Sequence, residues 1–372
     1  MVQMRFFPRD GTMRPVNRGI GAEGDPGRSP GASPVVHGVV RVLHVLPAPD
    51  GSTQYVDHML GGAPPEIRIL TFTWFRAIFG AYDVLHVHWP EFLVRQRTTA
   101  GRLVKLVLAW TLLLRLELTE TPVVRTAHNL APHESGDRLE RAFLAALDRR
   151  TELWIRLNPT TPLPLGVRTA TIPHGHYRSV FPPDPGTTPE HGRLLQFGLV
   201  RRYKGIERLL EVFGAIDDPS LRLTVAGKPQ DADLAEHIIA VAAADPRVEA
   251  RLELVPDDAL AREVRRAELV VLPYLQMHNS GAALLALSLD RPVLVPRSEA
   301  TDALAREVGE GWVIMFDGAL QRGDLLRALA AARLVRERGI PPHLDDRDWD
   351  LVGVRHAEAY RRIVRSTAGR RS

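Results

Sequence analysis

The sequence predicts an α/β protein built from two Rossmann-like domains that face each other across a cleft. Short β-branched runs alternate with helix-length amphipathic segments from Val39 onward, which is typical of parallel sheets. The alternation stops in a Pro- and Gly-rich stretch at 181–192 and then starts again. The chain has 372 residues, 45% of them hydrophobic, enough for two domains with full cores.

The predicted strands fall into two sets of six. The first set is 39–46, 66–73, 82–89, 122–129, 152–158 and 169–174; the second is 193–200, 221–227, 248–255, 268–274, 291–296 and 311–317. We therefore expect domains at 38–180 and 193–345, joined by the linker 181–192. Residues 1–37 have no apolar period and are interpreted as a disordered extension. An amphipathic pattern within 346–372 predicts a last helix that crosses back to the first domain.

Composition removes several classes of function. There is no cysteine, so disulfides, thiolate nucleophiles and zinc ribbons are excluded. The net charge of +4 permits binding to anionic lipid or phosphate and does not indicate nucleic acid. No signal peptide or uninterrupted run of about 18 apolar residues is found, so a cytoplasmic protein is expected. The apolar segment 101–118 predicts either a packed helix or one lying in the membrane interface.

The best candidate for a phosphate site follows the first strand of the second domain. Arg201, Arg202 and Lys204 precede a helix that begins near Gly205. Cations together with free N–H groups at a helix N-terminus suit a pyrophosphate. The alternative is a solvated basic turn.

A second polar cluster precedes an apolar helix in the same domain. It contains His278, Asn279, Ser280 and Gly281, small and polar residues that let a phosphate or ribose approach the backbone. Helix capping explains one of the residues equally well.

The first domain offers carboxylates and histidines at strand ends. Glu91 follows Trp89 and Pro90, where desolvation favours a general base. His86 and His88, on the preceding strand, are expected to face opposite sides, and packing is the simpler role for one of them.

Two further loops carry histidines. The loop after the next strand holds His128 and Glu134, with capping as the alternative role; His174 and His176 precede the linker and either contact a ligand or form a hinge. Because the histidine pairs lack a third clustered ligand, no metal is predicted.

Five stretches, HVHWPE, PVVRTAHNLAPHE, HGHY, FGLVRRYKG and LPYLQMHNSGAALLALSLDRPVL, resemble GT-B glycosyltransferases. They are most similar to the family that transfers β-mannose from GDP-mannose to a glycolipid in xanthan-type exopolysaccharide assembly. The likeness spans about 39–360. Retaining GT-B families carry two glutamates eight positions apart, where this chain has Met277 and Leu285, so the resemblance implies an inverting enzyme. Those families also place Arg directly after the glycine of the phosphate loop, where this chain has Leu199. We expect Arg201 to substitute for that arginine.

The resemblance implies a single displacement on GDP-mannose with a lipid-linked oligosaccharide as acceptor. Glu91 is the expected base and Glu134 the reserve, while Arg201 and Lys204 stabilise the departing diphosphate without metal or other cofactor. His128 is expected at the donor sugar, and His278, Asn279, Ser280 and Gly281 at the ribose or phosphates. The remaining candidates, His88, Trp89, His174 and His176, are assigned to the acceptor side or the hinge. A lipid-linked acceptor also implies peripheral association with the inner face of the cell membrane.

Three alternatives stay open at this stage. The enzyme is a GT-B transferase with another nucleotide-sugar donor, a nucleotide-sugar epimerase, or a non-catalytic partner that binds a nucleotide sugar. An epimerase forms product from nucleotide sugar alone, and a binding partner shows no turnover.

Overall fold

The computed structural model describes residues 38–46, 58–59, 61–128, 136–275, 277 and 279–371. The predicted extension 1–37 and the candidates Glu134 and His278 lie outside the described residues.

The first half of the chain forms a six-stranded parallel sheet in the order β2-β1-β3-β4-β5-β6. All six strands coincide with predicted ones. The elements are β1 (Val40–Val45), β2 (Ile67–Thr71), α2 (Trp74–Phe79), β3 (Val84–Val87), η1 (Pro90–Leu93), α3 (Thr99–Leu118), β4 (Val123–Ala127), α4 (Arg138–Arg150), β5 (Thr151–Arg156) and β6 (Thr169–Thr171).

The second half forms another six-stranded parallel sheet, in the order β12-β11-β10-β7-β8-β9. Its elements are β7 (Arg193–Phe197), η2 (Arg202–Lys204), α5 (Ile206–Gly214), β8 (Arg222–Ala226), α6 (Ala232–Ala244), β9 (Val248–Arg251), α7 (Asp257–Arg266), β10 (Leu269–Val271), α8 (Gly281–Ser288), β11 (Val293–Pro296), α9 (Glu299–Val308), β12 (Val313–Phe316), α10 (Arg322–Arg338), η3 (Asp345–Arg347) and α11 (Trp349–Arg371). Two parallel α/β sheets, with strand order reversing at β1 and β7, are the predicted architecture.

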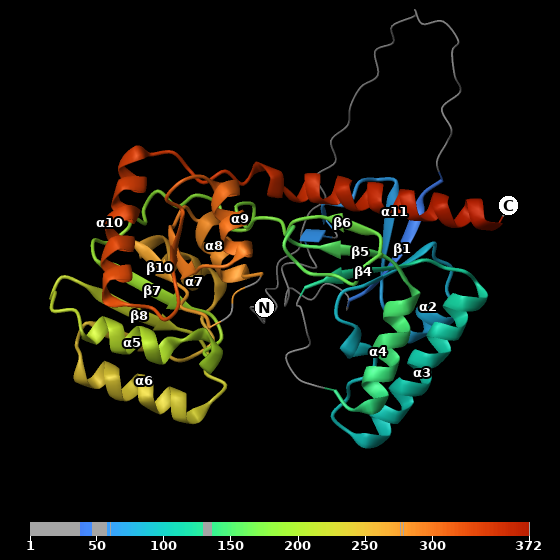
Figure 1. The fold of residues 1–372 in the computed structure, drawn as a ribbon, viewed down its shortest axis with the longest axis horizontal. Helices are drawn as coiled ribbons and strands as arrows, with labels where there is room; N and C mark the ends of the chain where they lie inside the picture. The colour runs from blue at the N-terminus through green and yellow to red at the C-terminus, as the bar shows by residue number, and fades with distance from the viewer. Residues whose placement is uncertain are drawn as a thin grey trace, which may run out of the picture.

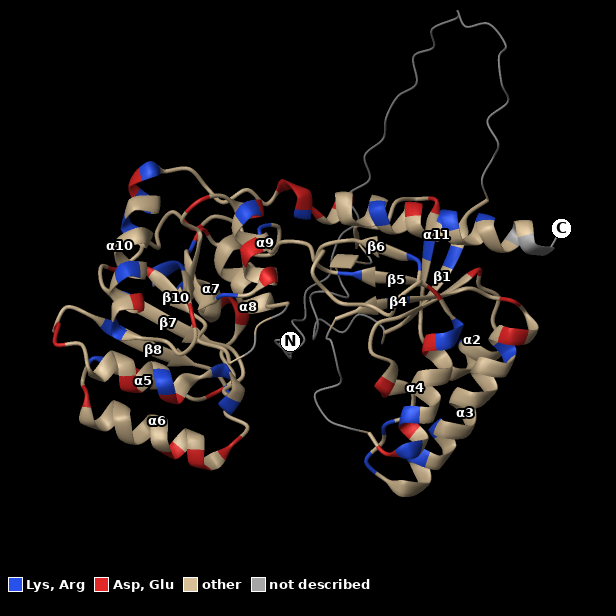
Figure 2. Cartoon of the chain, in the orientation of Figure 1, with Lys and Arg blue, Asp and Glu red and all other residues tan. Residues whose placement is uncertain are grey.

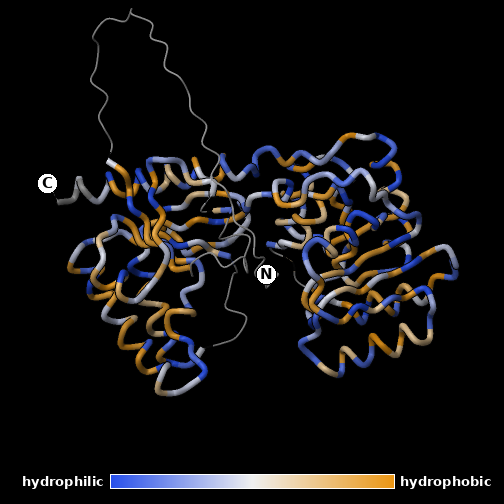
Figure 3. The backbone as a smooth tube through the Cα atoms, turned by 180° about the vertical axis from the view of Figure 1, so that it is seen from behind, coloured by the Kyte–Doolittle hydropathy of each residue, from blue (hydrophilic) through white to orange (hydrophobic). Residues whose placement is uncertain are grey.

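Helices cover both faces of each sheet, which is why the central strands are almost entirely buried, as in β3 and β7. On one face of the first sheet, Leu85 packs with Leu112 of α3 and Phe143 of α4. In the second sheet, α5 and α10 cover one face and α7 and α8 the other. Figure 3 shows the resulting concentration of apolar residues along both sheets.

The last helix crosses back to the first half, as predicted. Figure 1 shows α11 leaving the second half and running along the first, and Val352, Tyr360 and Ile363 join the core beneath β1 and β3. The crossing is anchored at its start, where the Trp349 indole donates to the carbonyl of His176 at 2.9 Å.

The segment 181–192 packs on the second half. Phe181 enters the core of that half, and the Arg265 guanidinium of α7 donates to the carbonyl oxygens of Phe181 (3.0 Å) and Pro182 (2.6 Å). Charged residues of both signs are interspersed over both halves in Figure 2, so the net charge of +4 is not concentrated in one element.

Candidate active site between the two sheets

The loop between β7 and α5 is shaped by a glycine in the left-handed region. Gly205 has φ 66°, and a Cβ at this position would lie 2.1 Å from the carbonyl oxygen of Pro273. Only glycine satisfies both conditions without displacing the backbone that follows β10. The loop therefore turns tightly into α5 and brings Arg201 and Lys204 to its N-terminus.

Lys204, which is buried, and Arg201, which is half-buried, form a cationic pair without an acidic partner among the described residues. Lys204 is only 4% exposed, and its ammonium makes no hydrogen bond or ion pair within the described residues. Burial, followed by the positive charge of Arg201, lowers the pKa of Lys204 from 10.5 to about 8. The Arg201 Nε is buried and lacks a hydrogen-bond partner among the described residues. Uncompensated buried cations are costly unless an anion binds there.

Arg202 is held away from this pair, contrary to the expectation that all three cations serve the phosphates. Its guanidinium contacts Asp231 at 2.8 Å and Glu207 at 3.0 Å, and half of the side chain is exposed. Arg202 is thus the solvated, ion-paired member of the cluster.

The polar cluster before α8 divides into a cap and a bridge. The Ser280 hydroxyl accepts from the amide of Ala283, so this residue is the N-cap of α8, and Gly281 is its first residue. Asn279 joins the two halves: its Nδ2 donates to the carbonyl of His128 at 3.0 Å, and its Oδ1 accepts from Nδ2 of Asn158 at 2.7 Å. These bonds place the loop after β10 against those after β4 and β5, so the carboxyl ends of the two sheets face each other.

On the first half, an aromatic pair includes Trp89, which lies two residues before the candidate base. The rings of Trp89 and His128 stack with centroids 4.5 Å apart, and both side chains are buried. Glu91 is half-buried in the first turn of η1. The negative charge of Glu91 acts on Arg125 of β4. Burial lowers the pKa of Arg125 from 12.5 to about 10, and the charge of Glu91 opposes this lowering.

The histidines of this half are brought together, and two statements made from sequence are wrong. His86 and His88 have ring centroids 4.1 Å apart, because residues two apart on a strand point to the same side. A third histidine, His44 of β1, lies with them, so that ring nitrogens of the three lie within 4.8 Å of one another. The premise that no third ligand clusters there is thus overturned, while the absence of a metal stays a prediction.

A repeated tetrapeptide could have revealed His44. The letters VLHV occur at 42–45 and again at 84–87, and β1 and β3 pair in parallel with His44 opposite His86. The repeat is visible in the sequence, but only the order of the strands in the sheet shows that its two histidines are neighbours.

His174 and His176 lie at the junction between the two halves. His176 Nε2 is 3.2 Å from the Asp348 carboxylate, and its amide donates to the carbonyl of Arg347 at 2.9 Å. Burial lowers the pKa of His174 to about 4. Both histidines thus pack where α11 departs.

The comparisons with known proteins agree with this architecture. A model of the family described as glycosyl transferases group 1 matches residues 192–333. Anabaena HepE in complex with UDP and glucose shares the fold, with a TM-score of 0.59 over 87% of this chain and 99% of its own, at 13% identity. The catalytic domain of starch synthase IV from Arabidopsis thaliana gives 0.60 over 88% and 100%, at 10% identity. The fold is that of the GT-B glycosyltransferases.

Two curated proteins of Xanthomonas campestris pv. campestris, each called GDP-mannose:glycolipid 4-beta-D-mannosyltransferase, are far more similar in sequence. Each is 45% identical to this chain over 322 residues, which cover 86% of the chain and 92% of the relative. The chain belongs to this family of mannosyltransferases and is a glycosyltransferase.

Proposed function

We propose that this enzyme transfers mannose from GDP-mannose, with inversion, to a hydroxyl of a lipid-linked oligosaccharide in exopolysaccharide assembly. The observation that carries the proposal is the cationic pair of half-buried Arg201 and buried Lys204, which has no acidic partner among the described residues and lies at the start of α5. The 45% identity to relatives named for this donor and acceptor class supports the choice of mannose and glycolipid.

The leaving diphosphate is the step at which these cations act. As the anomeric C–O bond breaks, negative charge accumulates on the phosphate oxygens, and two preorganised cations together with the α5 N-terminus stabilise it. In this proposal they take the place of a divalent metal. Ser280 and Gly281 at the start of α8 provide a second set of backbone N–H groups for the nucleotide.

A base on the opposite side completes the displacement. The acceptor oxygen bonds to the anomeric carbon, GDP departs with the bonding electron pair, and the acceptor proton passes to a carboxylate. Glu91 is our candidate, since it follows the carboxyl end of β3 two residues after Trp89, whose ring stacks on His128. Glu134 is the reserve, and His128 is assigned to the donor sugar.

The acceptor's lipid suggests a role for an exposed apolar surface. We define the α2–α3 apolar face as Phe75, Phe79, Leu103, Val104, Val107, Trp110, Leu114 and Leu118, whose exposed fractions lie between 45% and 76%. The α3 members recur every three or four residues along one side of the helix, while Leu106, Ala109, Leu112 and Leu116 face the core.

This arrangement is suited to a helix resting on a bilayer. The cations of α3 already have partners, since Arg102 pairs with Asp137 and Lys105 donates to the carbonyl oxygens of Phe92 (3.1 Å) and Arg95 (2.9 Å). The apolar residues therefore carry the proposal. Within the part of the chain that the structure describes, no helix is long and apolar enough to cross a membrane. We therefore propose peripheral association of a cytoplasmic enzyme through the α2–α3 apolar face.

The function is tested by nucleotide binding followed by transfer. A thermal-shift series with GDP, UDP, ADP and their sugar conjugates, in EDTA, should give stabilisation by GDP and GDP-mannose alone. Incubation with radiolabelled GDP-mannose and a membrane glycolipid extract should then move label into the lipid fraction.

Each alternative has its own result. Stabilisation by UDP compounds would mean that the donor is a UDP-sugar and not GDP-mannose. A new nucleotide sugar formed without acceptor would indicate an epimerase. GDP binding without transfer to any lipid fraction indicates a non-catalytic binding partner.

A further inference from the structure

Two asparagines far apart in the sequence join the loops that follow β5 and β10. Asn158 comes two residues after the end of β5, and Asn279 directly precedes the N-cap of α8. The Nδ2 of Asn158 donates to Oδ1 of Asn279 at 2.7 Å, and the Nδ2 of Asn279 donates to the carbonyl oxygen of His128 at 3.0 Å. We call Asn158, Asn279 and the His128 carbonyl group the asparagine bridge.

The local sequence fixes the amide of Asn158. Its Oδ1 accepts from the backbone amide of Thr160 at 2.9 Å and from the Thr160 hydroxyl at 2.7 Å, which is an Asx turn. The intervening Pro159 disfavours a helical backbone at Asn158 and so favours this turn. Because a backbone N–H can only donate, the oxygen of Asn158 must face Thr160. Its NH₂ group therefore faces Asn279.

The direction of the asparagine bridge follows from its two ends. It begins at the backbone N–H of Thr160, which only donates, and ends at the carbonyl of His128, which only accepts. Between these ends, Asn279 has to accept from Asn158 with Oδ1 and donate to His128 with Nδ2. A reversed Asn279 amide would set oxygen against oxygen on one side and NH₂ against NH₂ on the other. Asn158 thus determines how Asn279 presents its amide to His128.

The asparagine bridge connects the two sides of the proposed donor site. Asn279 is followed by Ser280 and Gly281 at the N-terminus of α8, where the nucleotide is proposed to bind. His128 carries the ring assigned to the donor sugar, which stacks on Trp89 with centroids 4.5 Å apart. A single side-chain amide therefore links the turn assigned to the nucleotide to the residue assigned to the sugar.

We propose that Asn158 is a positioning residue for the transfer reaction: by orienting Asn279, it sets His128 relative to the N-terminus of α8. This inference rests on the proposed function, in which the nucleotide binds to the second half and the mannosyl group contacts His128. A displacement between the two halves then misplaces the sugar while the nucleotide keeps its contacts, so the reaction loses its geometry before it loses GDP binding.

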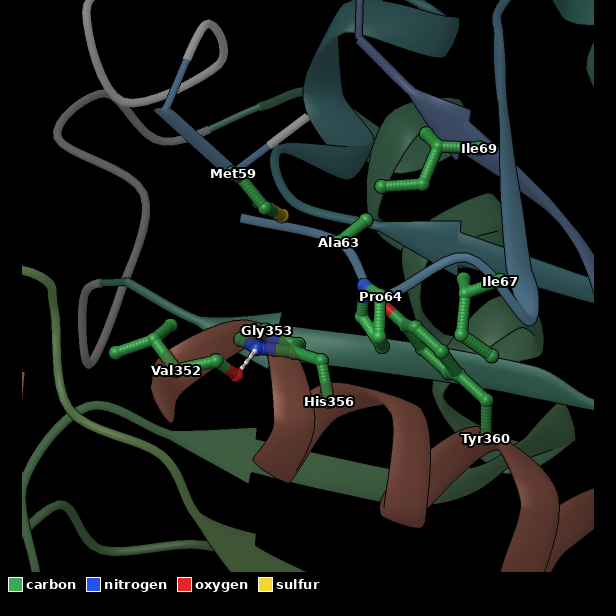
Figure 4. A pocket seen from close by; sticks show the side chains of 9 residues that line it. All are labelled: Met59, Ala63, Pro64, Ile67, Ile69, Val352, Gly353, His356 and Tyr360. Atoms are coloured by element: carbon green, nitrogen blue, oxygen red, sulfur yellow. Dashed lines mark hydrogen bonds between the residues drawn. The ribbon is translucent and has the colours of Figure 1, made fainter. Parts of the chain in front are cut away.

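The two halves are also joined by α11, through a contact of a different kind. Figure 4 shows Gly353 and His356 of α11 lining a small cavity together with Pro64 and Ile67. A Cβ on Gly353 would collide with the carbonyl oxygen of Gly62, and the cavity of about 10 Å³ has room for about one water. The helix is therefore closely seated by residues other than those of the asparagine bridge, and we expect bridge variants to keep this seat.

A direct contact between Asn279 and the nucleotide is the competing explanation for its place in the loop. Both ends of its amide bond to the first half, which accounts for its orientation by protein groups. The two explanations differ in what they predict for Asn158. A direct contact predicts weaker GDP binding from changes at Asn279 alone, whereas the asparagine bridge predicts the same defect in sugar placement from changes at either asparagine.

Asn158→Asp is the most informative variant, because a carboxylate keeps the Asx turn with Thr160 and removes the donor toward Asn279. Two oxygens then meet, either between positions 158 and 279 or, if the Asn279 amide reverses, between Asn279 and His128. By calorimetry, we expect the Kd of GDP to stay within about twofold and the Kd of GDP-mannose to rise about tenfold, with kcat about tenfold lower. Asn279→Asp should show the same pattern.

Two further variants separate this effect from charge and from general loss of a hydrogen bond. Asn158→Ser keeps a hydroxyl that can accept from Thr160 but cannot reach Asn279, so it should reproduce the defect without a new charge. Ser366→Ala on α11 is the control: it loses the hydrogen bond from Arg168 Nη1 at 3.1 Å, which also joins distant parts of the chain. The control should keep both Kd values and kcat.

Three results would overturn the proposal. The first is normal affinity for GDP-mannose and normal kcat in Asn158→Asp. The second is a loss of GDP affinity as large as that of GDP-mannose, in either aspartate variant, since this indicates a direct contact or a general structural defect. The third is an equal defect in Ser366→Ala.

The asparagine bridge can also be observed without activity. The chain has four asparagines, so ¹⁵N labelling at asparagine gives few side-chain NH₂ signals, and the variants assign them. In the unmodified full chain, the NH₂ protons of Asn158 and Asn279 should exchange with solvent at least about tenfold more slowly than those of free asparagine. Protection of Asn279 should be lost in Asn158→Asp. Unprotected NH₂ groups in the unmodified protein refute the asparagine bridge, whereas a lack of stabilisation by GDP refutes the proposed function.

Discussion

Replacing Lys204 by methionine is expected to stabilise the protein and to weaken its binding of GDP. Methionine keeps most of the length of the buried side chain and removes the charge. Burial lowers the pKa of Lys204 from 10.5 to about 8, which means that the folded protein holds the charged form at a cost relative to the unfolded chain.

The size of this cost follows from linkage. A lowering from 10.5 to about 8 corresponds to about 3 kcal/mol in the free energy of unfolding, at about 1.4 kcal/mol per tenfold change. The cation–π contact with Tyr274, 5.3 Å from the ring centroid, offsets about 1 kcal/mol. The variant should therefore gain about 2 kcal/mol at pH 7, a rise of a few degrees in Tm.

The pH dependence has a defined sign. Below pH 8 the lysine is charged in both states and the cost is fully present. As the pH rises from 8 to 10.5, the folded protein releases the proton before the unfolded chain does, so the cost fades. The stability advantage of the variant should shrink across this window.

The assay is thermal unfolding from pH 6.5 to 10 with and without GDP, together with calorimetric titration of GDP. Loss of one charge-assisted hydrogen bond of about 1.5–3 kcal/mol weakens the affinity by about 10- to 150-fold. Arg202→Gln, which removes the neighbouring ion-paired cation, should lose far less affinity. A variant that is less stable than the parent at pH 7, or that binds GDP equally well, refutes the reasoning.

Three further outcomes are expected. Gly205→Ala, with its Cβ placed 2.1 Å from the Pro273 carbonyl oxygen, should cost at least about 2 kcal/mol by chemical denaturation, whereas Gly214→Ala, whose Cβ meets nothing within 4 Å, should be neutral. Glu91→Gln should bind GDP-mannose normally by calorimetry and lose transfer by about 10²- to 10⁴-fold; unchanged transfer moves the base role to Glu134. Val107→Glu should weaken flotation with anionic vesicles by about tenfold, while Ile239→Glu on α6 should not. Equal flotation of the two variants would exclude the α2–α3 apolar face as the membrane-binding surface.

The sequence was sufficient for the elements of the fold because local patterns specify them. Most of the twelve strands are apolar runs bounded by turn residues, and parallel pairing follows from their alternation with helices. Ser280 could be predicted as an N-cap for the same reason, since capping depends on residues three apart. The loop with Arg201 and Lys204 lies between a strand and a helix, as expected, while its role in binding phosphate stays a prediction.

Side-chain partners were harder to predict, because charge alone does not say which neighbour neutralises it. Arg201, Arg202 and Lys204 are equivalent in sequence, yet Arg202 is bound by Asp231 of a different loop. Segment 101–118 is apolar on most sides, and only packing separates its core side from its exposed side.

What the sequence by itself determined is the class of fold and the order of its strands along the chain. Tertiary structure decided which loops meet. Strand order in space placed His44 beside His86, the facing of the sheets set Asn279 against His128, and the crossing of α11 inserted Tyr360 between histidines far away in sequence. These contacts join residues more than 40 positions apart, and such pairings depend on the packing of whole sheets and helices, which no local pattern encodes.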